Sequence, residues 1–392
     1  MISVSAAKSI IRKNVSPLAP TVSALENAAY HVLADDIYSR YDIPAFRQSS
    51  MDGYAVKFDD RVEELTVVGE MAAGAAHELT IKTGEACRIF TGAPLPAGAD
   101  TVVMQEKIGR SGDKIRILDT DLQRGANVRA RGSETSAGAL AMQHGALLTP
   151  AAIGFLAGIG VTGVSIYPAP IVAIISTGKE LQQPGQDLKF GQVYESNSYS
   201  LSAALKKEGI ETIALFTSDD ELNILTHTLQ KALAIADVVL LTGGVSVGDY
   251  DFVIEASRQC GVAQLFHKVK QKPGKPLFFG KKEEKLVFGL PGNPSSVLNC
   301  YYNYVLPSIQ QLTNKESGLK EVTAVLTHGY QKAAGLSHFL KGNFKDGKAT
   351  PLSAQESYRM SSFAQANCLI CLPENEEQFT AGQQVTLLLF PD

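Results

Sequence analysis

Residues 242–251 of the chain read TGGVSVGDYD, residues 272–276 read KPGKP, and residues 289–295 read GLPGNPS. The first segment follows the apolar run Val238–Leu241, so its glycines, hydroxyl and carboxylates are expected at the carboxyl end of a strand, where α/β sheets bind ligands. The second segment fixes two lysines beside a rigid turn. The third is a Gly/Pro turn that opens a helix at Ser295, and a helix N-terminus attracts phosphate-like groups. Together the three segments predict a site for an anionic ligand.

The surrounding residues, 169–314, alternate between strand and helix patterns. The run Ile171–Ile175 is continuously apolar, which is typical of a buried parallel strand. Further strands are predicted at 211–216 and 238–241, and helices at 197–208 and 221–234. This alternation predicts a doubly wound sheet whose strand ends share one edge. Polar residues follow three of these strands: Thr177, Gly178 and Glu180 after the first, Asp219 and Asp220 after the second, and residues 243–251 after the third.

The composition is that of an ordinary globular protein. The chain has 392 residues, of which 45% are hydrophobic and 19% charged, and this length predicts about two to four domains. A net charge of −4 argues against a protein that coats nucleic acid. Five cysteines without regular spacing, and no charged-then-apolar leader at the N-terminus, indicate a reducing cytosol rather than export.

One stretch, residues 135–178, contains no Asp, Glu, Lys or Arg and so imitates a membrane span. Thr149 and Pro150, however, form a helix-start signal, glycines interrupt the apolar run, and Pro168 and Pro170 end it. A spanning helix needs about 20 consecutive apolar residues. We therefore expect a short buried helix, a turn and a core strand instead of a membrane segment.

The regions on either side of the α/β pattern are different in kind. Segment 45–140 is rich in Gly and Ala and contains short β-like runs, which predict a small β domain. The tail shows short strands such as Cys368–Leu372 and Gln384–Leu389, as expected of a compact β barrel or sandwich. Cys368 and Cys371 have metal-ligand spacing, but residues three apart on a strand point to opposite faces and no second Cys or His pair lies nearby. We therefore assign them to the core.

Across nearly its whole length the sequence resembles the molybdopterin molybdenumtransferase family, to which the C-terminal domain of gephyrin is related. The matching motifs, besides the three segments quoted above, are SMDGYA at 50–55, TGAPLP at 91–96, RARG at 129–132, STGKEL at 176–181 and QES at 355–357. The resemblance implies an elongated four-domain homodimer. Its parts would be a helical linking and dimerisation domain at 1–44 and 141–168, an inserted β domain at 45–140, a molybdopterin-binding α/β domain at 169–314 similar to the molybdopterin adenylyltransferase, and a C-terminal β barrel at 315–392.

The resemblance also implies a reaction: the enzyme takes adenylylated molybdopterin and molybdate, uses Mg²⁺, releases AMP and leaves molybdenum on the dithiolene. Molybdopterin adenylyltransferase and apo-molybdoenzymes would be its partners in the cytoplasm, with no role for nucleic acid or a membrane. The central domain alone would also fit an adenylyltransferase or a nucleotide hydrolase of the same sheet type, and the kinship with gephyrin would fit a scaffold. The motifs at 50–55 and 91–96 weigh against the first alternative, and the retained lysines and carboxylates weigh against the second.

Molybdate is a tetrahedral dianion and the other substrate carries phosphates, so the pocket must supply cations and N–H donors. Lys268, Lys270 and Lys272 alternate and would face one side of a strand, with Lys275 after the turn. The resemblance places Lys268, Lys272 and Lys275 in the pocket and Lys270 beside it. A solvated edge strand is the alternative, but the Pro and Gly residues around the lysines favour binding. The remaining substrate-binding residues implied are Thr177, Gly178, Gly243, Gly244, Ser246, Pro291, Pro294, Lys341 and Ser357.

Cleavage of a phosphoanhydride calls for a divalent cation, and carboxylates together with substrate oxygens hold Mg²⁺. Glu180, Asp219 and Asp251 follow three different strands and could converge on that ion; for Asp219 the alternative is a helix cap. The resemblance makes these acids catalytic and adds Asp52, Thr91 and Glu134.

Three positions depart from the family pattern. Glu134 stands where Asp is usual, Lys341 where Arg is usual, and Tyr358 and Arg359 where a His is common. Lysine cannot repeat the bidentate fork of arginine on an oxyanion, so we expect molybdate to be held differently, with Arg359 as a candidate helper.

Overall fold

The computed structural model describes residues 1–244, 252–316 and 319–391. The chain forms two compact units: one comprises residues 1–23, 28–34 and 165–392, and the other residues 24–27 and 35–164. Two predicted site residues, Ser246 and Asp251, lie outside the described residues. The finer division into four domains stays a prediction.

The larger unit contains a six-stranded sheet in the order β17-β14-β18-β22-β21-β19. Four parallel neighbours are β17 (Ile213–Ser218), β14 (Val172–Thr177), β18 (Val238–Thr242) and β22 (Lys285–Leu290). Two antiparallel strands complete the sheet: β21 (Phe278–Lys282) and β19 (Ala263–His267). Residues 283–284 join β21 to β22 by a two-residue turn, with Glu283 at a φ of 53°. So short a connection permits only antiparallel pairing, a feature that the apolar runs alone do not predict.

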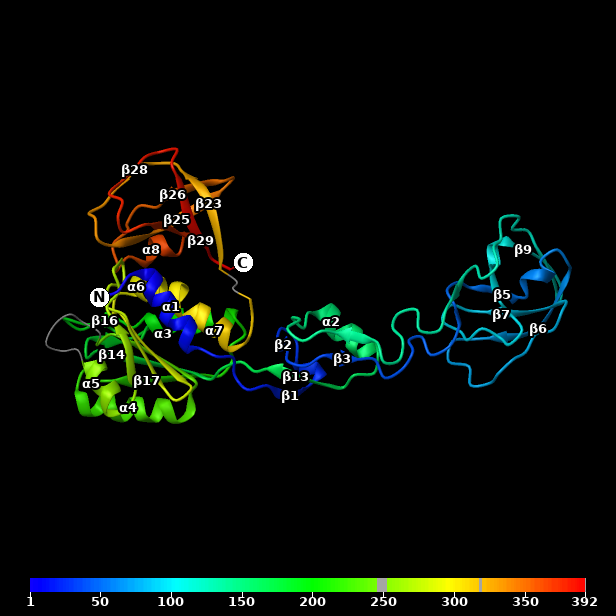
Figure 1. Ribbon diagram of the computed structural model, residues 1–392, viewed down its shortest axis with the longest axis horizontal. Helices are drawn as coiled ribbons and strands as arrows, with labels where there is room; N and C mark the ends of the chain where they lie inside the picture. Colours follow the sequence, from blue (N-terminus) through cyan, green and yellow to red (C-terminus); the bar gives the residue numbers. More distant parts are fainter. Residues whose placement is uncertain (245–251, 317–318, 392) are drawn as a thin grey trace. The chain divides into compact units, whose positions relative to one another are not determined.

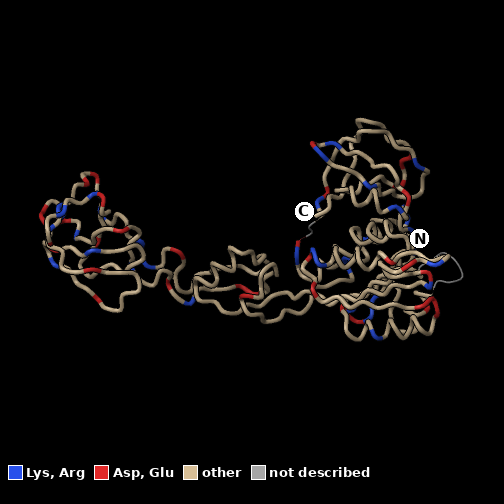
Figure 2. Tube along the Cα trace, turned by 180° about the vertical axis from the view of Figure 1, so that it is seen from behind, with Lys and Arg blue, Asp and Glu red and all other residues tan. Residues whose placement is uncertain are grey.

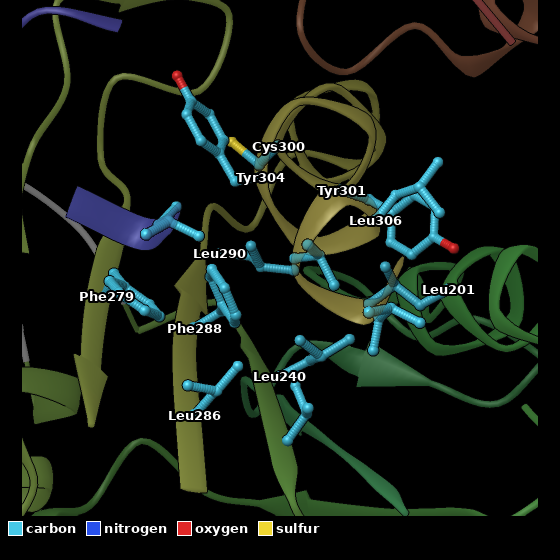
Figure 3. Packing of buried hydrophobic residues seen from close by; sticks show 14 of the residues in the cluster. Leu201, Leu240, Phe279, Leu286, Phe288, Leu290, Cys300, Tyr301, Tyr304 and Leu306 are labelled. Atoms are coloured by element: carbon cyan, nitrogen blue, oxygen red, sulfur yellow. The ribbon is translucent and has the colours of Figure 1, made fainter. Parts of the chain in front are cut away.

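Helices cover both faces of this sheet, as a doubly wound fold requires (Figure 1). One face carries α1 (Val4–Asn14), α3 (Asn197–Lys207), α6 (Pro294–Cys300) and α7 (Leu306–Leu312), and the other carries α4 (Leu222–Ile235) and α5 (Phe252–Gln259). A π-helical segment, Tyr301–Val305, joins α6 to α7. Figure 3 shows the apolar cluster between the sheet and the helices α1, α3, α6 and α7. In it, Phe288 and Leu290 of β22 lie near Tyr301 and Tyr304 of the π-helical segment. All six residues of β14 are buried, as its apolar run predicted.

The C-terminal strands form a closed barrel. Their order is β20-β25-β26-β23-β29-β27, and an additional pairing between β25 and β27 closes the ring. The strands are β20 (Gln271–Lys272), β23 (Lys320–Leu326), β25 (Ser337–Lys345), β26 (Lys348–Pro351), β27 (Cys368–Leu372) and β29 (Gln384–Leu389). Closure removes the exposed edges that an open sheet would present. Lys272 of β20 pairs with His338 of β25, so the segment with the two lysines is attached to the barrel.

The smaller unit contains a six-stranded sheet in the order β8-β5-β7-β6-β10-β9 and the short strand pairs β11-β4 and β12-β3. The sheet strands are β5 (Gly53–Val56), β6 (Leu65–Met71), β7 (Glu85–Ile89), β8 (Thr101–Met104), β9 (Ile108–Ser111) and β10 (Lys114–Ile117). The pairs are β11 (Val128–Arg129) with β4 (Gln48–Ser49) and β12 (Leu140–Met142) with β3 (Ile37–Tyr38). The small β domain predicted from segment 45–140 therefore has the expected strand content.

Short elements complete the chain. They are β1 (Thr21–Ala24), β2 (Val32–Leu33), β13 (Gly163–Tyr167), β15 (Leu181–Gln182), β16 (Val193–Tyr194), β24 (Tyr330–Gln331), β28 (Gln378–Phe379), α8 (Met360–Phe363) and the 3₁₀ helices Leu25–Asn27, Phe58–Asp60 and Gln105–Lys107. Of the helices that the described residues form, none has both the length and the apolar character needed to cross a membrane.

The uncharged stretch contains the helix α2 (Pro150–Gly158), which begins as predicted. The Thr149 hydroxyl accepts a hydrogen bond from the N–H of Ala152 at 3.2 Å, and Pro150 occupies the first turn. The expected burial of this helix is wrong within a single chain, because Leu156 is its only buried residue. Five of the nine residues of this apolar helix are exposed, and these five are Pro, Ala and Gly.

Candidate active site

A pocket of about 930 Å³ opens at the carboxyl ends of β14, β18 and β22. Its walls come from the ends of these strands, the turn at 271–276, the turn at 291–294 and the barrel loop at 355–358. Apart from residues 245–251, which are not described, all three segments quoted at the opening therefore contribute to one cavity. Its position at the carboxyl edge of the sheet is where doubly wound folds bind ligands, and its size suits a small molecule.

Nine of the residues predicted from sequence line this pocket: Thr177, Glu180, Gly243, Gly244, Lys272, Lys275, Pro291, Pro294 and Ser357. Gly178 and Asp219 line a neighbouring cavity of about 440 Å³ instead. Lys268 and Lys341 line neither cavity, and Asp52, Thr91 and Glu134 belong to the smaller unit. Further polar residues that were not predicted as site residues also line the pocket, among them Glu195, Asn197, Asp220, Gln271 and Asn293.

The two lysines of the turn supply positive charge to the pocket. Lys272 and Lys275 are exposed, and neither forms an ion pair with a described residue. The expected run of alternating lysines on one strand is wrong, because only Gln271 and Lys272 form β20, whereas Lys268 adopts a left-handed φ of 70°. Charges that lack an internal partner are available to an anionic ligand.

Buried side chains support this turn from behind. The Gln271 amide nitrogen donates to the carbonyl oxygen of Gly274 at 2.8 Å, and the Gln271 oxygen accepts from the hydroxyl of Tyr304. Gly274 has a φ of 87°, and a Cβ placed there would lie 2.7 Å from the sulfur of Cys300. Figure 3 shows Cys300 and Tyr304 adjacent at one end of the apolar cluster. The turn therefore requires glycine and is anchored to the helical segment below it.

The exits of β14 and β18 approach each other closely at the pocket wall. The hydroxyl of Thr177 donates to the carbonyl oxygen of Thr242 at 3.2 Å. Gly243 follows with a φ of 85°, and a Cβ there would lie 2.7 Å from the carbonyl oxygen of Thr177. Only glycine fits this approach, which leaves backbone rather than side chain facing the ligand space.

Among the described residues, four carboxylates line the pocket, and two of them, Glu180 and Asp220, closely follow the ends of β14 and β17. Burial, together with the nearby negative charge of Glu180, raises the pKa of Asp220 above its usual range. Asp219 is exposed and lines the neighbouring cavity of about 440 Å³, whereas the next residue, Asp220, lines this pocket. A bound cation would relieve the repulsion between the two negatively charged carboxylates.

The described residues contain no cluster of three or more His, Cys, Asp and Glu that could hold a metal by itself. Mg²⁺ needs only one or two carboxylates when substrate oxygens and water complete its coordination. Glu180 and Asp220 therefore fit a cation that is held jointly by protein and substrate. The predicted ligand Asp251 lies outside the described residues, and Asp219 stays a prediction.

The barrel contributes Ser357 to the pocket. Its hydroxyl oxygen accepts from the side-chain amide of Asn293 at 2.8 Å, and its carbonyl oxygen accepts from the N–H of Ser295 at 3.0 Å. These bonds tie the barrel loop to the GLPGNPS turn. Arg359, a candidate helper for molybdate, forms an ion pair with Glu356 at 3.6 Å.

Two predicted residues of the smaller unit contact each other directly. Asp52 accepts hydrogen bonds from the backbone N–H of Thr91 at 2.8 Å and from its hydroxyl at 2.9 Å. These bonds, with a smaller contribution from the charge of Arg88, lower the pKa of the Asp52 carboxyl. Thr91 of the TGAPLP motif therefore stabilises the ionised form of the exposed Asp52 carboxylate in the SMDGYA motif. Glu134 is also exposed, and its backbone N–H donates to Ile43 at 2.9 Å.

Comparisons with known proteins agree with this architecture. Residues 2–160 match the family described as MoeA N-terminal region (domain I and II), residues 173–311 match a probable molybdopterin binding domain, and residues 323–390 match the MoeA C-terminal region (domain IV). A solved structure titled as a molybdopterin biosynthesis MoeA protein from Pyrococcus horikoshii superposes with a TM-score of 0.85 at 28% identity, with both chains covered completely.

Curated relatives are similar over most of their length. The molybdopterin molybdenumtransferase of a Nostoc species is 36% identical, with 92% of this chain and 86% of the relative covered. That of Haemophilus influenzae is 34% identical, with 93% and 92% covered. By its sequence, its three matched regions and its fold, the chain belongs to the molybdopterin molybdenumtransferase family.

Proposed function

We propose that the chain inserts molybdenum from molybdate into adenylylated molybdopterin, with release of AMP and water, as a step of molybdenum cofactor biosynthesis. The observation that carries this proposal is the pairing, within one pocket, of two lysines that form no ion pair with a described residue and two mutually repelling carboxylates. An anionic substrate and a divalent cation together satisfy both halves of that pocket. The family relationship supplies the identity of the substrates.

In this proposal Lys272 and Lys275 hold the oxyanion and substrate phosphate, and the hydroxyl of Ser357 donates to them. The Gly243 and Gly244 backbone and the hydroxyl of Thr177 line the opposite wall. The remaining predicted binding residues, Gly178, Ser246, Lys268, Pro291 and Pro294, are kept as proposals.

Glu180 and Asp220 would hold Mg²⁺, which supplies charge neutralisation at the phosphoanhydride oxygens when bound. Asp219 and Asp251 are kept as proposed further ligands on the basis of the family resemblance. Asp52, Thr91 and Glu134 are proposed catalytic residues on the same basis, and the lowered pKa of the Asp52 carboxyl supports an electrostatic role.

We infer further that the chain forms a homodimer. Support comes from α2, an apolar helix whose residues Gly154 and Gly158 would meet nothing within 4 Å if a Cβ were added. Figure 2 shows this helix without charged residues. An uncharged helix with so much exposed surface is stabilised when a second copy covers it.

The proposed setting is the cytoplasm, with molybdopterin adenylyltransferase as supplier of the substrate and apo-molybdoenzymes as recipients of the product. All five cysteines are free thiols, which suits a reducing compartment. No role in nucleic-acid binding is proposed, because charges of both signs are interspersed along the chain (Figure 2) and the net charge is −4. Among the described residues, no observation specifically favours an adenylyltransferase or hydrolase activity, and none favours a scaffold role.

Titration of the purified chain with molybdate tests the anion pocket. Lys275→Ala should weaken binding by at least ~10-fold, because one charge-assisted contact is lost. Lys275→Arg should restore binding only in part, since a larger planar group must fit beside Gly274. Lys281→Ala is the matched control, because Lys281 lies on β21 and pairs with Glu284 at 3.1 Å. Equal affinity in the Lys275→Ala and wild-type chains would reduce the segment to a structural turn.

A further inference from the structure

Lys341 of β25 is a buried lysine, with 2% of its surface exposed. Its ammonium donates three hydrogen bonds to backbone carbonyl oxygens: Ala354 at 2.8 Å, Arg359 at 3.0 Å and Glu356 at 3.3 Å. An ammonium has three N–H donors, so all of them are used within the protein. An oxyanion would have to displace a carbonyl to bind Lys341 directly.

The backbone of Lys341 is tied to the same loop. Its N–H donates to the side-chain oxygen of Gln355 at 3.0 Å, and its carbonyl accepts from the Gln355 side-chain nitrogen at 2.8 Å. The hydroxyl of Ser362 donates to the carbonyl of Ala354 at 2.7 Å, and Ala354 itself has a left-handed φ of 57°. The side chain and the backbone of Lys341 are therefore both hydrogen-bonded to the loop at 354–359.

Ser357 sits between the carbonyls that Lys341 binds, and it lines the pocket. Its carbonyl oxygen accepts from the N–H of Ser295, and its hydroxyl oxygen accepts from Asn293. Among the described residues, nothing accepts the hydroxyl hydrogen of Ser357, which leaves that hydrogen available to a bound anion. The position of this donor depends on the loop, and the loop depends on Lys341.

We propose that Lys341 is a positioning residue, which acts on the oxyanion through the loop at 354–359 by holding the Ser357 hydroxyl toward the pocket. The inference rests on the proposed function for the ligand, and on the observed hydrogen bonds for the mechanism. Burial lowers the pKa of Lys341 below its usual range, and the nearby charge of Glu356 opposes that shift. Lys341 therefore differs in role from Lys272 and Lys275, whose ammonium groups are exposed and form no ion pair with any residue that the structure describes.

The test combines molybdate titration with hydrogen exchange. Lys341→Met should weaken molybdate binding by ~10-fold and Ser357→Ala by a similar factor, and the double variant should lose no more than either single one. Lys341→Met should also speed exchange of the Ser295 N–H, which donates to the Ser357 carbonyl. If Lys341 bound molybdate directly, the two losses would multiply to ~100-fold and the Ser295 exchange rate would stay unchanged, which would overturn the proposal.

Two further variants guard against a folding artefact. Lys332→Met is the matched control, because Lys332 is another buried barrel lysine that donates to the carbonyls of Leu336 and Glu374, outside the loop; its molybdate affinity should equal that of the wild type. Ser362→Ala loosens the loop through Ala354 while it keeps the ammonium, so it should weaken binding and speed Ser295 exchange. Unchanged exchange in both Lys341→Met and Ser362→Ala would refute the positioning role. If the wild type bound no molybdate, the proposed function would fail, whereas the exchange measurements would still decide the role of Lys341.

Discussion

Replacement of Gln271 by leucine should damage the anion pocket without removing a charge. Gln271 is fully buried and satisfies two groups, the carbonyl of Gly274 and the hydroxyl of Tyr304. Leucine has a similar volume but makes no hydrogen bond, so both groups would lose this partner. Each buried group left unsatisfied costs about 1–3 kcal/mol, which gives a loss of about 2–6 kcal/mol in the free energy of unfolding. That loss is a large share of the about 5–15 kcal/mol that stabilises a typical domain.

Urea unfolding of Gln271→Leu and wild type measures this loss, and molybdate titration measures its effect on the turn. Tyr304→Phe is the matched variant, because it removes the hydroxyl but keeps the bond from Gln271 to Gly274, and it should cost about 1–2 kcal/mol. Molybdate affinity should fall in Gln271→Leu and change less in Tyr304→Phe. A Gln271→Leu chain within ~0.5 kcal/mol of wild type, with unchanged affinity, would show that this network does not hold the turn.

Three further predictions concern a carboxylate, a cation and the dimer. Thr91→Val removes one hydrogen-bond donor to Asp52, so the pKa of Asp52 should rise toward its ordinary value in an NMR titration. A lowered carboxyl pKa gives stability that is lost as pH falls, so the variant should lose less stability in acid than the wild type. An unchanged Asp52 pKa would contradict this prediction. Asp220→Asn removes a carboxyl whose raised pKa lowers the stability of the fold once the pH exceeds the ordinary pKa of Asp. The variant should therefore be more stable at neutral pH without Mg²⁺ and should lose the Mg²⁺-induced rise in Tm. A rise in Tm equal to that of the wild type would show that Asp220 does not bind the cation. Gly154→Glu should convert dimer to monomer in sedimentation without unfolding α2, with Gly154→Ala as control, and a persisting dimer would place the interface elsewhere.

Sequence patterns predicted the central sheet, the polar strand exits and the start of α2, because apolar runs and capping residues are local signals. They could not distinguish Asp219 from Asp220, since the direction of adjacent side chains after a strand depends on how the backbone leaves the sheet. Lys268 has a left-handed φ of 70° instead of the predicted extended backbone, and its neighbour Val269 pairs with Ile2, which lies 267 residues away in sequence.

Lys341 shows a different limit. Its charge and its place in the family pattern predicted a ligand for an anion. Its actual partners are carbonyls in a loop that folds back from 13 to 18 residues downstream. A backbone carbonyl leaves no trace in the sequence, so this contact was visible only in the fold.

The pocket with Lys272, Lys275, Glu180 and Asp220 is proposed to carry out molybdate-dependent turnover. The most direct measurement is chromatographic quantification of AMP after incubation of the purified chain with adenylylated molybdopterin, Mg²⁺ and molybdate. AMP release should require molybdate, fall by at least ~10-fold in a Lys272→Ala, Lys275→Ala double variant, and be unchanged in Lys281→Ala. AMP release at the same rate without molybdate, or full activity in the double variant, would contradict this proposal.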